Sequence, residues 1–243
     1  MTIAVLHPGE MGAALGAALV AVGRPVLWTS AGRSSETAER AGRAGLTGGD
    51  PLTADVIVSV CPPHAALDVA RSVAGFTGVY VEANAVSPAT SRAVAALLPE
   101  ATFVDGGIIG SPPVEAGTTR LYLSGAAADE VAALFAGTIV DARIVGDASA
   151  LKMVYAAWTK GSAALLLAAR ATAEAYGAGE ALEAEWEELG LLSRLAGAER
   201  SADTKGWRWT AEMEEIADTF AAAGQPDGFH RAAAAVYRAR SSR

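Results

Sequence analysis

The chain has 243 residues, of which 51% are hydrophobic and 19% are charged. This composition excludes an intrinsically disordered chain, and the length is sufficient for one large domain or two modest ones. The formal net charge of −8 argues against a general nucleic-acid binder, so we expect no nucleic-acid partner.

The single cysteine, Cys61, excludes an intrachain disulfide and leaves no cysteine spacing typical of a zinc site. No apolar run reaches the roughly 20 residues that a membrane-spanning helix needs. The chain starts directly on a predicted strand, without the charged segment and cleavage site of a secretory leader. We therefore expect a soluble cytoplasmic protein with no metal site and no membrane partner.

From residue 1 to about residue 145, short β-branched runs alternate with alanine-rich stretches of helical length. Several of these runs lack polar alternation, which is typical of strands covered on both faces of a parallel sheet. A β-α repeat of this kind predicts a doubly wound α/β sheet with right-handed crossovers. The predicted strands are residues 2–7, 25–30, 56–61, 79–84, 102–109, 119–125 and 142–146.

The character of the sequence changes after residue 146, because no convincing strand follows. Asp147 is placed to cap a helix of about 30 residues, and Gly177 is placed to end it. Further helices are predicted around 180–196, 210–223 and 227–240. We therefore place a domain boundary between residues 146 and 147, with a long helix and a small all-helical domain over 147–243.

The segment "HPGEMG" follows the first predicted strand and precedes a helix. Gly9 and Gly12 occupy the second and third positions of the dinucleotide-binding pattern G-x-G-x-x-G, whereas His7 replaces the first glycine. A plain strand-to-helix turn is the alternative. We predict a Rossmann-type NAD(P)-binding domain over residues 1–146. The predicted cofactor contacts in this turn are His7, Pro8, Gly9, Glu10, Met11 and Gly12.

The end of the second strand indicates which nicotinamide cofactor is bound. NAD-binding folds usually place an acid there to hold the ribose hydroxyls, but here no acid occurs before Glu36. Thr29, Ser30, Arg33 and Ser34 are instead suited to surround a 2′-phosphate, with Arg33 supplying charge-assisted hydrogen bonds. A polar loop with one solvated arginine is the alternative. We predict NADP as the cofactor, with NAD as the second possibility.

Five motifs in order resemble the β-hydroxyacid dehydrogenase superfamily, which includes 3-hydroxyisobutyrate and 6-phosphogluconate dehydrogenases. They are the glycine turn, "VCPPHAA", "EANAVSP", "VDGGIIGSPP" and "GDASALKMVYA". A later stretch, "WRWTAEMEEIADTFAAAGQPDGFHRAAA", resembles a phosphogluconate dehydrogenase-like branch with a short helical C-terminal domain. The resemblance implies an NAD(P)-dependent dehydrogenase that forms a homodimer through its C-terminal helices.

The resemblance also implies that Lys152 is the general acid and base of the reaction. Independently of it, Lys152, Tyr155, Thr159 and Ser162 recur at helical spacing and form a polar stripe on an apolar helix. Tyr155 stands where the family often has Asn or His, and it retains a hydroxyl that can donate a hydrogen bond. A surface lysine with a buried stem is the alternative for Lys152.

Two further motifs match loops near the cofactor in the family. Cys61, Pro62 and Pro63 match the loop that covers the cofactor after the third strand, and Cys61 itself is expected to be packed, because no group that would activate it is evident. Asn84 matches a position near the nicotinamide and the substrate. A structural turn ahead of residues 87–88 is the alternative for Asn84.

The family's substrate loop reads "DGGIIGS" in this chain. The usual serine is Ile109, which favours a bulkier or less polar substrate than a small hydroxy acid. Gly110, Ser111 and, on the long helix, Thr159 complete the predicted substrate contacts.

Together these patterns predict an NADP-preferring oxidoreductase that transfers a hydride between the nicotinamide and a carbonyl or alcohol carbon of a small-molecule substrate. Two alternatives remain open. One is an imine reductase of the same superfamily, and the other is a cofactor-binding sensor or complex subunit without turnover.

Overall fold

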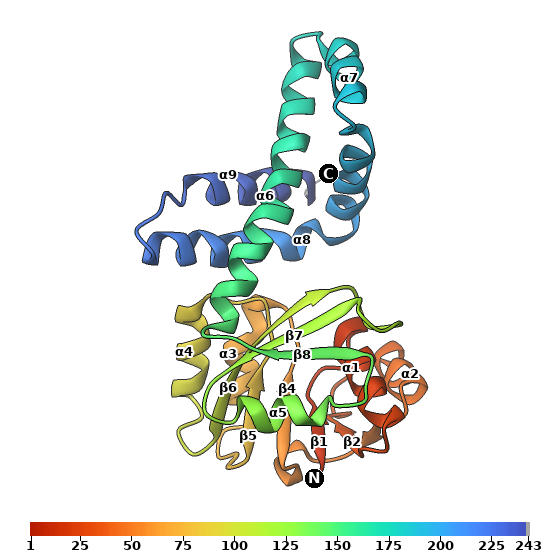
Figure 1. Cartoon of the computed structure of the whole chain (residues 1–243), viewed down its shortest axis with the longest axis vertical. Helices are drawn as coiled ribbons and strands as arrows, with labels where there is room; N and C mark the ends of the chain where they lie inside the picture. The colour runs from red at the N-terminus through yellow and green to blue at the C-terminus, as the bar shows by residue number, and fades with distance from the viewer. Residues whose placement is uncertain (242–243) are drawn as a thin grey trace. The chain divides into compact units, whose positions relative to one another are not determined.

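The computed structural model describes residues 1–241, which divide into two compact units (Figure 1). The first unit spans Met1–Lys152 and the second begins at Met153. This division falls inside helix α6 (Ala148–Ala175), and not after residue 146 where the sequence placed the boundary. The first turns of α6 thus group with the sheet of the first unit.

The first unit contains an eight-stranded sheet in the order β3-β2-β1-β4-β5-β6-β7-β8. The first six positions have the 3-2-1-4-5-6 order of the dinucleotide-binding fold, which confirms the predicted α/β Rossmann-type class. The strands are β1 (Ile3–Val5), β2 (Val26–Trp28), β3 (Thr47–Gly48), β4 (Val56–Ser59), β5 (Val79–Glu82), β6 (Thr102–Gly110), β7 (Thr119–Ser124) and β8 (Val140–Ile144). Only the two-residue strand β3 has no counterpart among the predicted strands.

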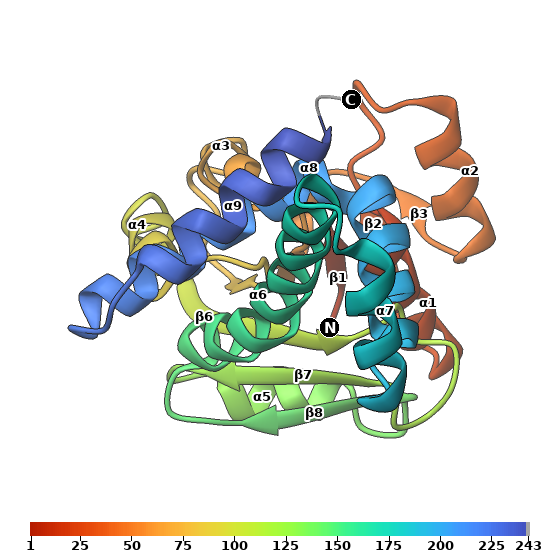
Figure 2. The same cartoon turned by 90° about the horizontal axis from the view of Figure 1, so that it is seen from above.

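The sheet is not parallel throughout, because β7 runs antiparallel to β6 and β8 runs parallel to β7 (Figure 2). The apolar runs of the sequence predicted a parallel sheet. The connection between β6 and β7, residues 111–118, contains no helix. A parallel pair requires a long crossover, whereas a short connection returns the chain beside the strand it has just left.

Helices cover both faces of the sheet, and the two faces have separate apolar cores. Ile3 and Val5 face one core, and Ala4 and Leu6 face the other, because successive side chains of a strand point to opposite faces. Helices α1 (Glu10–Ala21), α2 (Ser35–Arg43) and α5 (Ala128–Leu134) contribute buried residues to the first core. Helices α3 (Ala66–Arg71) and α4 (Pro88–Ala96) contribute to the second.

The N-terminus of α6 is bonded to side chains from three places in the first unit. The Ala150 amide donates to Oδ1 of Asp147 at 2.7 Å, which confirms the predicted cap. The Ala148 amide donates to Oγ of Ser124 on β7 at 3.0 Å. The Ser149 amide donates to Oδ2 of Asp105 on β6 at 2.7 Å. Three amides that have no partner within the helix are therefore satisfied.

The Asp105 carboxylate is the centre of this arrangement. It also accepts hydrogen bonds from the hydroxyls of Ser91 (2.7 Å), Ser124 (3.2 Å) and Ser149. These donors come from α4, β7 and α6, so one carboxylate joins three elements to β6. Negative charge at this position also complements the positive end of the α6 dipole.

The second unit is helical, and its remaining helices are α7 (Gly179–Glu188), α8 (Leu192–Ala222) and α9 (Gly228–Ser241). The prediction of separate helices at 180–196 and 210–223 was wrong, because α8 runs without a break through Gly197 and Gly206. The break lies at Gly190, whose φ of +67° is left-handed and ends α7. Gly177 adopts φ +67° just after α6, so it ends the long helix as predicted.

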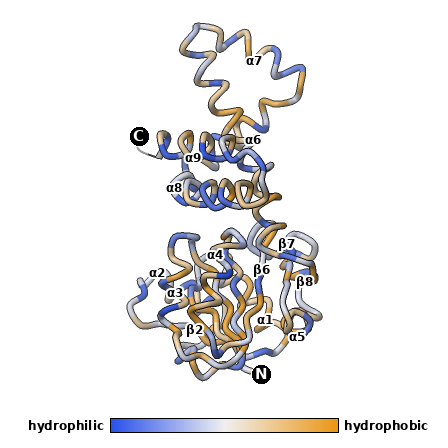
Figure 3. Tube along the Cα trace, turned by 90° about the vertical axis from the view of Figure 1, so that its left-hand side faces the viewer, coloured by the Kyte–Doolittle hydropathy of each residue, from blue (hydrophilic) through white to orange (hydrophobic). Residues whose placement is uncertain are grey.

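Hydrophobic residues are concentrated in the strands of the first unit (Figure 3).

None of the helices within residues 1–241 is both long enough and apolar enough to cross a membrane. Within the same residues, no group of three or more His, Cys, Asp or Glu side chains is placed to hold a metal ion.

We predict that Asp105→Asn lowers the free energy of unfolding by about 2 kcal/mol, because an amide cannot accept from all the donors and leaves a buried N–H without a partner. Urea unfolding followed by circular dichroism measures this change. Asp141→Asn is the matched control, since it removes a carboxylate that pairs with exposed Arg143 at 2.5 Å and should lower the free energy of unfolding much less than Asp105→Asn does. Equal effects of the two substitutions would contradict the role assigned to Asp105.

Candidate functional site

The register of the sheet places several strand ends in one row. Ser59 on β4 pairs with Glu82 on β5, Glu82 pairs with Asp105 on β6, and Asp105 pairs with Ser124 on β7. On the other side, the Leu6 amide after β1 donates to the Val58 carbonyl oxygen. The loops after β1, β4 and β5 therefore leave the same edge of the sheet. In doubly wound folds, ligands bind outside this edge where the strand order reverses, here between β1 and β4.

The glycine turn lies at this edge. Gly9 is the N-cap of α1, and no side chain caps the amides that follow it. The first intrahelical bond runs from the Ala13 amide to the Gly9 carbonyl oxygen, so the preceding amides remain available for a ligand. A Cβ on Gly12 would collide with the His7 carbonyl oxygen, so Gly12 allows the close approach of helix and strand that its position predicts. A Cβ on Gly9 would meet no atom within 4 Å.

His7 and Thr29 each carry a buried polar atom at the end of a strand. Nδ1 of His7 and Oγ1 of Thr29 have no hydrogen-bond partner among the described residues. Burial, and then the positive charge of Arg33, lowers the pKa of His7 to about 4, so its imidazole is neutral at pH 7. Buried polar atoms are rarely left unpaired, which indicates that a ligand or solvent completes this edge.

The other residues of the turn differ in accessibility. Pro8 is buried, Met11 is half-buried against the first core, and Glu10 is exposed in the first turn of α1. Of the three, Glu10 is thus the most accessible to solvent.

Two of the predicted cofactor contacts in the loop after β2 are exposed to solvent. Ser30 and Arg33 are exposed, and Gly32, at φ +71°, makes the turn that precedes Arg33. Arg33 lies near enough to His7 to affect its pKa, so its charge is beside the glycine turn. Ser34 is already used within the protein, since its hydroxyl caps α2 by accepting from the Thr37 amide at 3.3 Å.

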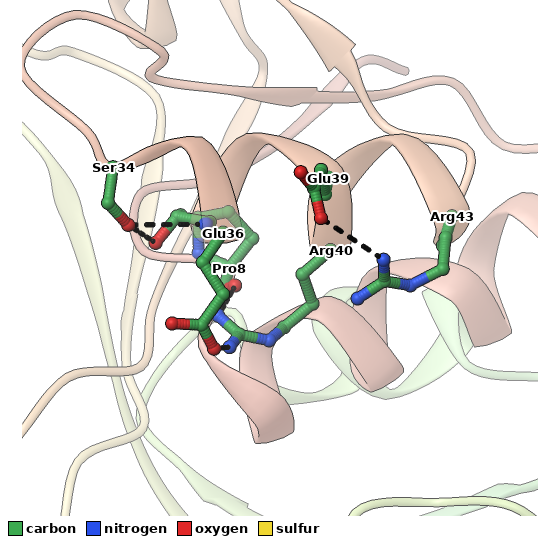
Figure 4. Close-up of polar contacts among 7 residues, drawn as sticks. Pro8, Ser34, Glu36, Glu39, Arg40 and Arg43 are labelled. Atoms are coloured by element: carbon green, nitrogen blue, oxygen red, sulfur yellow. Dashed lines mark hydrogen bonds and ion pairs between the residues drawn. The ribbon is translucent and has the colours of Figure 1, made fainter.

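Arg40 on α2 contacts the glycine turn, which the sequence did not predict. Its guanidinium donates to the Pro8 carbonyl oxygen at 3.4 Å and pairs with Oε1 of Glu36 at 2.5 Å (Figure 4). The four-residue spacing of Glu36 and Arg40 is visible in the sequence as a helical ion pair. Nothing in the sequence indicates the contact with Pro8, because it joins residues 32 positions apart.

The loop after β4 is held by Asn84. Oδ1 of Asn84 accepts from the Cys61 amide, and its Nδ2 donates to Oγ of Ser59 at 3.2 Å. Asn84 is only 2% exposed, so it joins the ends of β4 and β5 from inside the protein. The following residues, Pro62 and Pro63, lead into a short 3-10 turn, Pro63–Ala65.

The Cys61 thiol is protonated at neutral pH. Burial, and then the nearby charge of Glu82, raises its pKa to about 12. A thiol in this state is a poor nucleophile, which agrees with the expectation of a packed residue.

The predicted substrate loop forms the turn from β6 into β7. Ile109 is buried, and Ser111 is exposed while its carbonyl oxygen accepts from the Thr119 hydroxyl at 2.5 Å. Gly110 adopts φ +123°, and a Cβ there would collide with the Thr118 carbonyl oxygen. The glycine at this position is therefore required by the turn itself.

Lys152 lies in the first unit and beside the same edge of the sheet. A Cβ on Gly107 would lie 2.7 Å from the Ala148 carbonyl oxygen and 3.0 Å from Cβ of Lys152, so β6 packs directly on α6 just beyond Asp105. Lys152 is half-buried. Tyr155 and Thr159 belong to the second unit, where Tyr155 is exposed and the Thr159 hydroxyl donates to the Tyr155 carbonyl oxygen at 3.3 Å.

Each unit also contains a pocket. In the first unit, a pocket of about 230 Å³ lies beside the N-terminus of α6, and its lining includes Arg92, Asp105 and Asp147 but none of the predicted site residues. In the second unit, a pocket of about 330 Å³ between α6 and α8 is lined partly by Thr159 and Trp209.

Two sequence comparisons identify related segments. Residues 173–239 match the family described as "Domain of unknown function (DUF1932)". A segment of 117 residues is 37% identical to an "Uncharacterized 28.5 kDa protein in 7S RNA 5'region" of Methanothermus fervidus. That match covers 46% of this chain and 45% of the relative, so it spans less than half of either protein.

Solved structures match nearly the whole chain. A conserved protein of unknown function, MTH1747, whose structure is reported as similar to 3-hydroxyacid dehydrogenases, is 27% identical, with a TM-score of 0.71 and 99% of both chains covered. The 3-hydroxyisobutyrate dehydrogenase of Salmonella typhimurium has 16% identity and a TM-score of 0.71, over 100% of this chain and 94% of that one. The reductive aminase of Aspergillus terreus has 18% identity and a TM-score of 0.60, over 98% and 93%. The chain therefore has the fold of the β-hydroxyacid dehydrogenase superfamily, as its motifs indicate, with the DUF1932 segment in its helical C-terminal region.

Proposed function

We propose that the protein is an NAD(P)-dependent oxidoreductase. One observation carries the proposal. The uncapped N-terminus of α1 and the lysine Lys152, on a helix that is hydrogen-bonded to β6, lie at the same edge of the sheet. The structures of a dehydrogenase and of a reductive aminase in complex with NADPH share this fold, which supports the assignment.

The residues of the glycine turn suit a dinucleotide. The free amides at the start of α1 and the positive end of its dipole favour a pyrophosphate. The space beside Gly9 lets the backbone approach such a group, and no internal packing of the protein requires a glycine there. The unpaired Nδ1 of His7 and Oγ1 of Thr29 offer further hydrogen bonds. When bound, a nicotinamide cofactor supplies or accepts the hydride.

We propose a preference for NADP over NAD. Arg33 and Ser30 are exposed in the loop after β2, the charge of Arg33 lowers the pKa of His7, and no acid precedes Glu36 after β2. A guanidinium binds phosphate through short, charge-assisted hydrogen bonds, whereas a ribose 2′-hydroxyl is normally held by an acid.

We assign the proton transfer to Lys152. Its ammonium group would donate a proton to the substrate oxygen when a carbonyl is reduced, and the neutral amine would remove one when an alcohol is oxidised. The hydrogen bonds to Asp105 fix the turn of α6 that precedes Lys152, which limits the positions its side chain can reach. The Tyr155 hydroxyl is proposed to donate a second hydrogen bond to the substrate.

Reduction of an imine is the second candidate activity. Its support is the shared fold of a reductive aminase in complex with NADPH. The substrate is proposed to be a small molecule with an apolar body, because Ile109 occupies the place of the family's serine.

A homodimer is proposed through the helices of the second unit. Val154, Trp158 and Leu165 are all exposed on α6, and their spacing of four and seven residues puts them on one helical face. Exposed apolar side chains that line up in this way often mark an interface.

For the cofactor, we predict that the protein binds NADPH more tightly than NADH in a titration followed by ligand fluorescence. Arg33→Gln should weaken NADPH binding by about tenfold and leave NADH binding nearly unchanged, because only NADPH carries the 2′-phosphate. Failure of the parent protein to bind either cofactor would show that the glycine turn is only an element of the fold.

For the reaction, we predict that Lys152→Ala lowers kcat by about 100-fold or more while the Kd for NADPH changes by less than about twofold. The assay is a panel of ketones, aldehydes and imines with NADPH. Lys205→Ala, at an exposed lysine of α8, is the control and should retain full activity. Parent protein that binds NADPH but turns over nothing in the panel would favour a sensor or complex subunit.

For the assembly, we predict a dimer at micromolar concentration in sedimentation velocity. Trp158→Glu should shift the protein toward monomer, because a charge would be buried at the proposed interface. A parent protein that sediments as a monomer would contradict the proposal.

A further inference from the structure

Glu36 occupies a position that matters for the choice between the two cofactors. It is the first acidic residue after β2, and it lies in the first turn of α2. In dinucleotide-binding folds an acid at the end of the second strand accepts hydrogen bonds from the ribose hydroxyls, and in this chain the first acid comes only in the helix that follows. The same negative charge repels a 2′-phosphate. A positive side chain that neutralises Glu36 would therefore favour binding of NADPH over NADH.

That partner is Arg40, one helical turn later. The two side chains pair at 2.5 Å, with Glu36 77% exposed and Arg40 only 24% exposed. A second guanidinium nitrogen of Arg40 donates to the Pro8 carbonyl oxygen at 3.4 Å. Figure 4 shows the guanidinium between the carboxylate of Glu36 and the glycine turn. Arg40 thus joins α2 to the loop that the proposed function assigns to the pyrophosphate.

The same helix contains a second pair with the same spacing. Arg43 and Glu39 lie 3.8 Å apart, and each is 69% exposed. No hydrogen bond joins Arg43 to the glycine turn among the described residues. This pair therefore reproduces the charges of Glu36 and Arg40 without their connection to Pro8.

We propose that Arg40 is a specificity-determining residue that favours NADPH, by neutralising Glu36 and by holding a positive charge on the glycine turn. The inference rests on the proposed function. A guanidinium has five N–H donors, and the contacts with Glu36 and Pro8 use two of its nitrogens. Without Arg40, the Glu36 carboxylate would be an uncompensated negative charge at the start of α2, just after the loop proposed to hold the 2′-phosphate.

The proposal is tested by removing the charge of each arginine in turn. Arg40→Gln and Arg43→Gln lower the net charge equally and keep a long polar side chain. The Kd values of NADPH and NADH are measured by ligand fluorescence at two salt concentrations. We expect Arg40→Gln to weaken NADPH binding by about tenfold, with NADH binding unchanged or tighter. We expect Arg43→Gln to change both by less than twofold, and added salt to reduce the effect of Arg40→Gln.

A double variant separates the two parts of the proposal. Glu36→Gln in the Arg40→Gln background removes the uncompensated carboxylate, so we expect NADPH binding to recover most of its loss. The same Glu36→Gln in the parent protein should leave NADPH binding unweakened. Circular dichroism and urea unfolding of all variants show that the changes in Kd do not reflect loss of folding.

Three results would overturn the inference while leaving the proposed function intact. They are an unchanged ratio of the two Kd values in Arg40→Gln, equal losses in Arg40→Gln and Arg43→Gln, and no recovery in the double variant. A parent protein that binds neither NADPH nor NADH would instead remove the proposed function, and the inference with it.

Discussion

The Asp105 carboxylate is the interaction on which the geometry of the first unit depends. It accepts hydrogen bonds from a helix on one face of the sheet, from the neighbouring antiparallel strand and from the first turn of α6. Because all these donors converge on one side chain, the middle of β6 and the start of α6 are fixed together. The close contact of Gly107 with the same turn of α6 reinforces this arrangement from the backbone.

The candidate site follows from where this contact lies in the sheet. Asp105 is in register with Glu82, which is in register with Ser59, so the anchored turn of α6 and the loops after β4 and β5 share one edge. The glycine turn leaves the same edge after β1. Parallel strands bring together loops that are distant in the sequence, and the capped first turn of α6 places Lys152 beside β6.

Local signals made much of the fold predictable from the sequence. The cap at Asp147, the stop at Gly177 and the close approach at Gly12 each depend on a few neighbouring residues. The antiparallel β7 and the contact of Arg40 with Pro8 depend on tertiary pairing, which no local pattern records. Ser34 illustrates the same limit, because a hydroxyl suited to a phosphate is equally suited to cap the helix that follows it.

The continuity of α6 across both units limits how the protein can be divided. A fragment that ends at residue 146 would keep the Asp105 carboxylate but lose the Ser149 donors that it holds. The first unit therefore cannot be separated from the rest of the chain at the point where its last strand ends. Any exchange of the helical region with that of another protein must retain at least the first turns of α6, or supply a replacement for them.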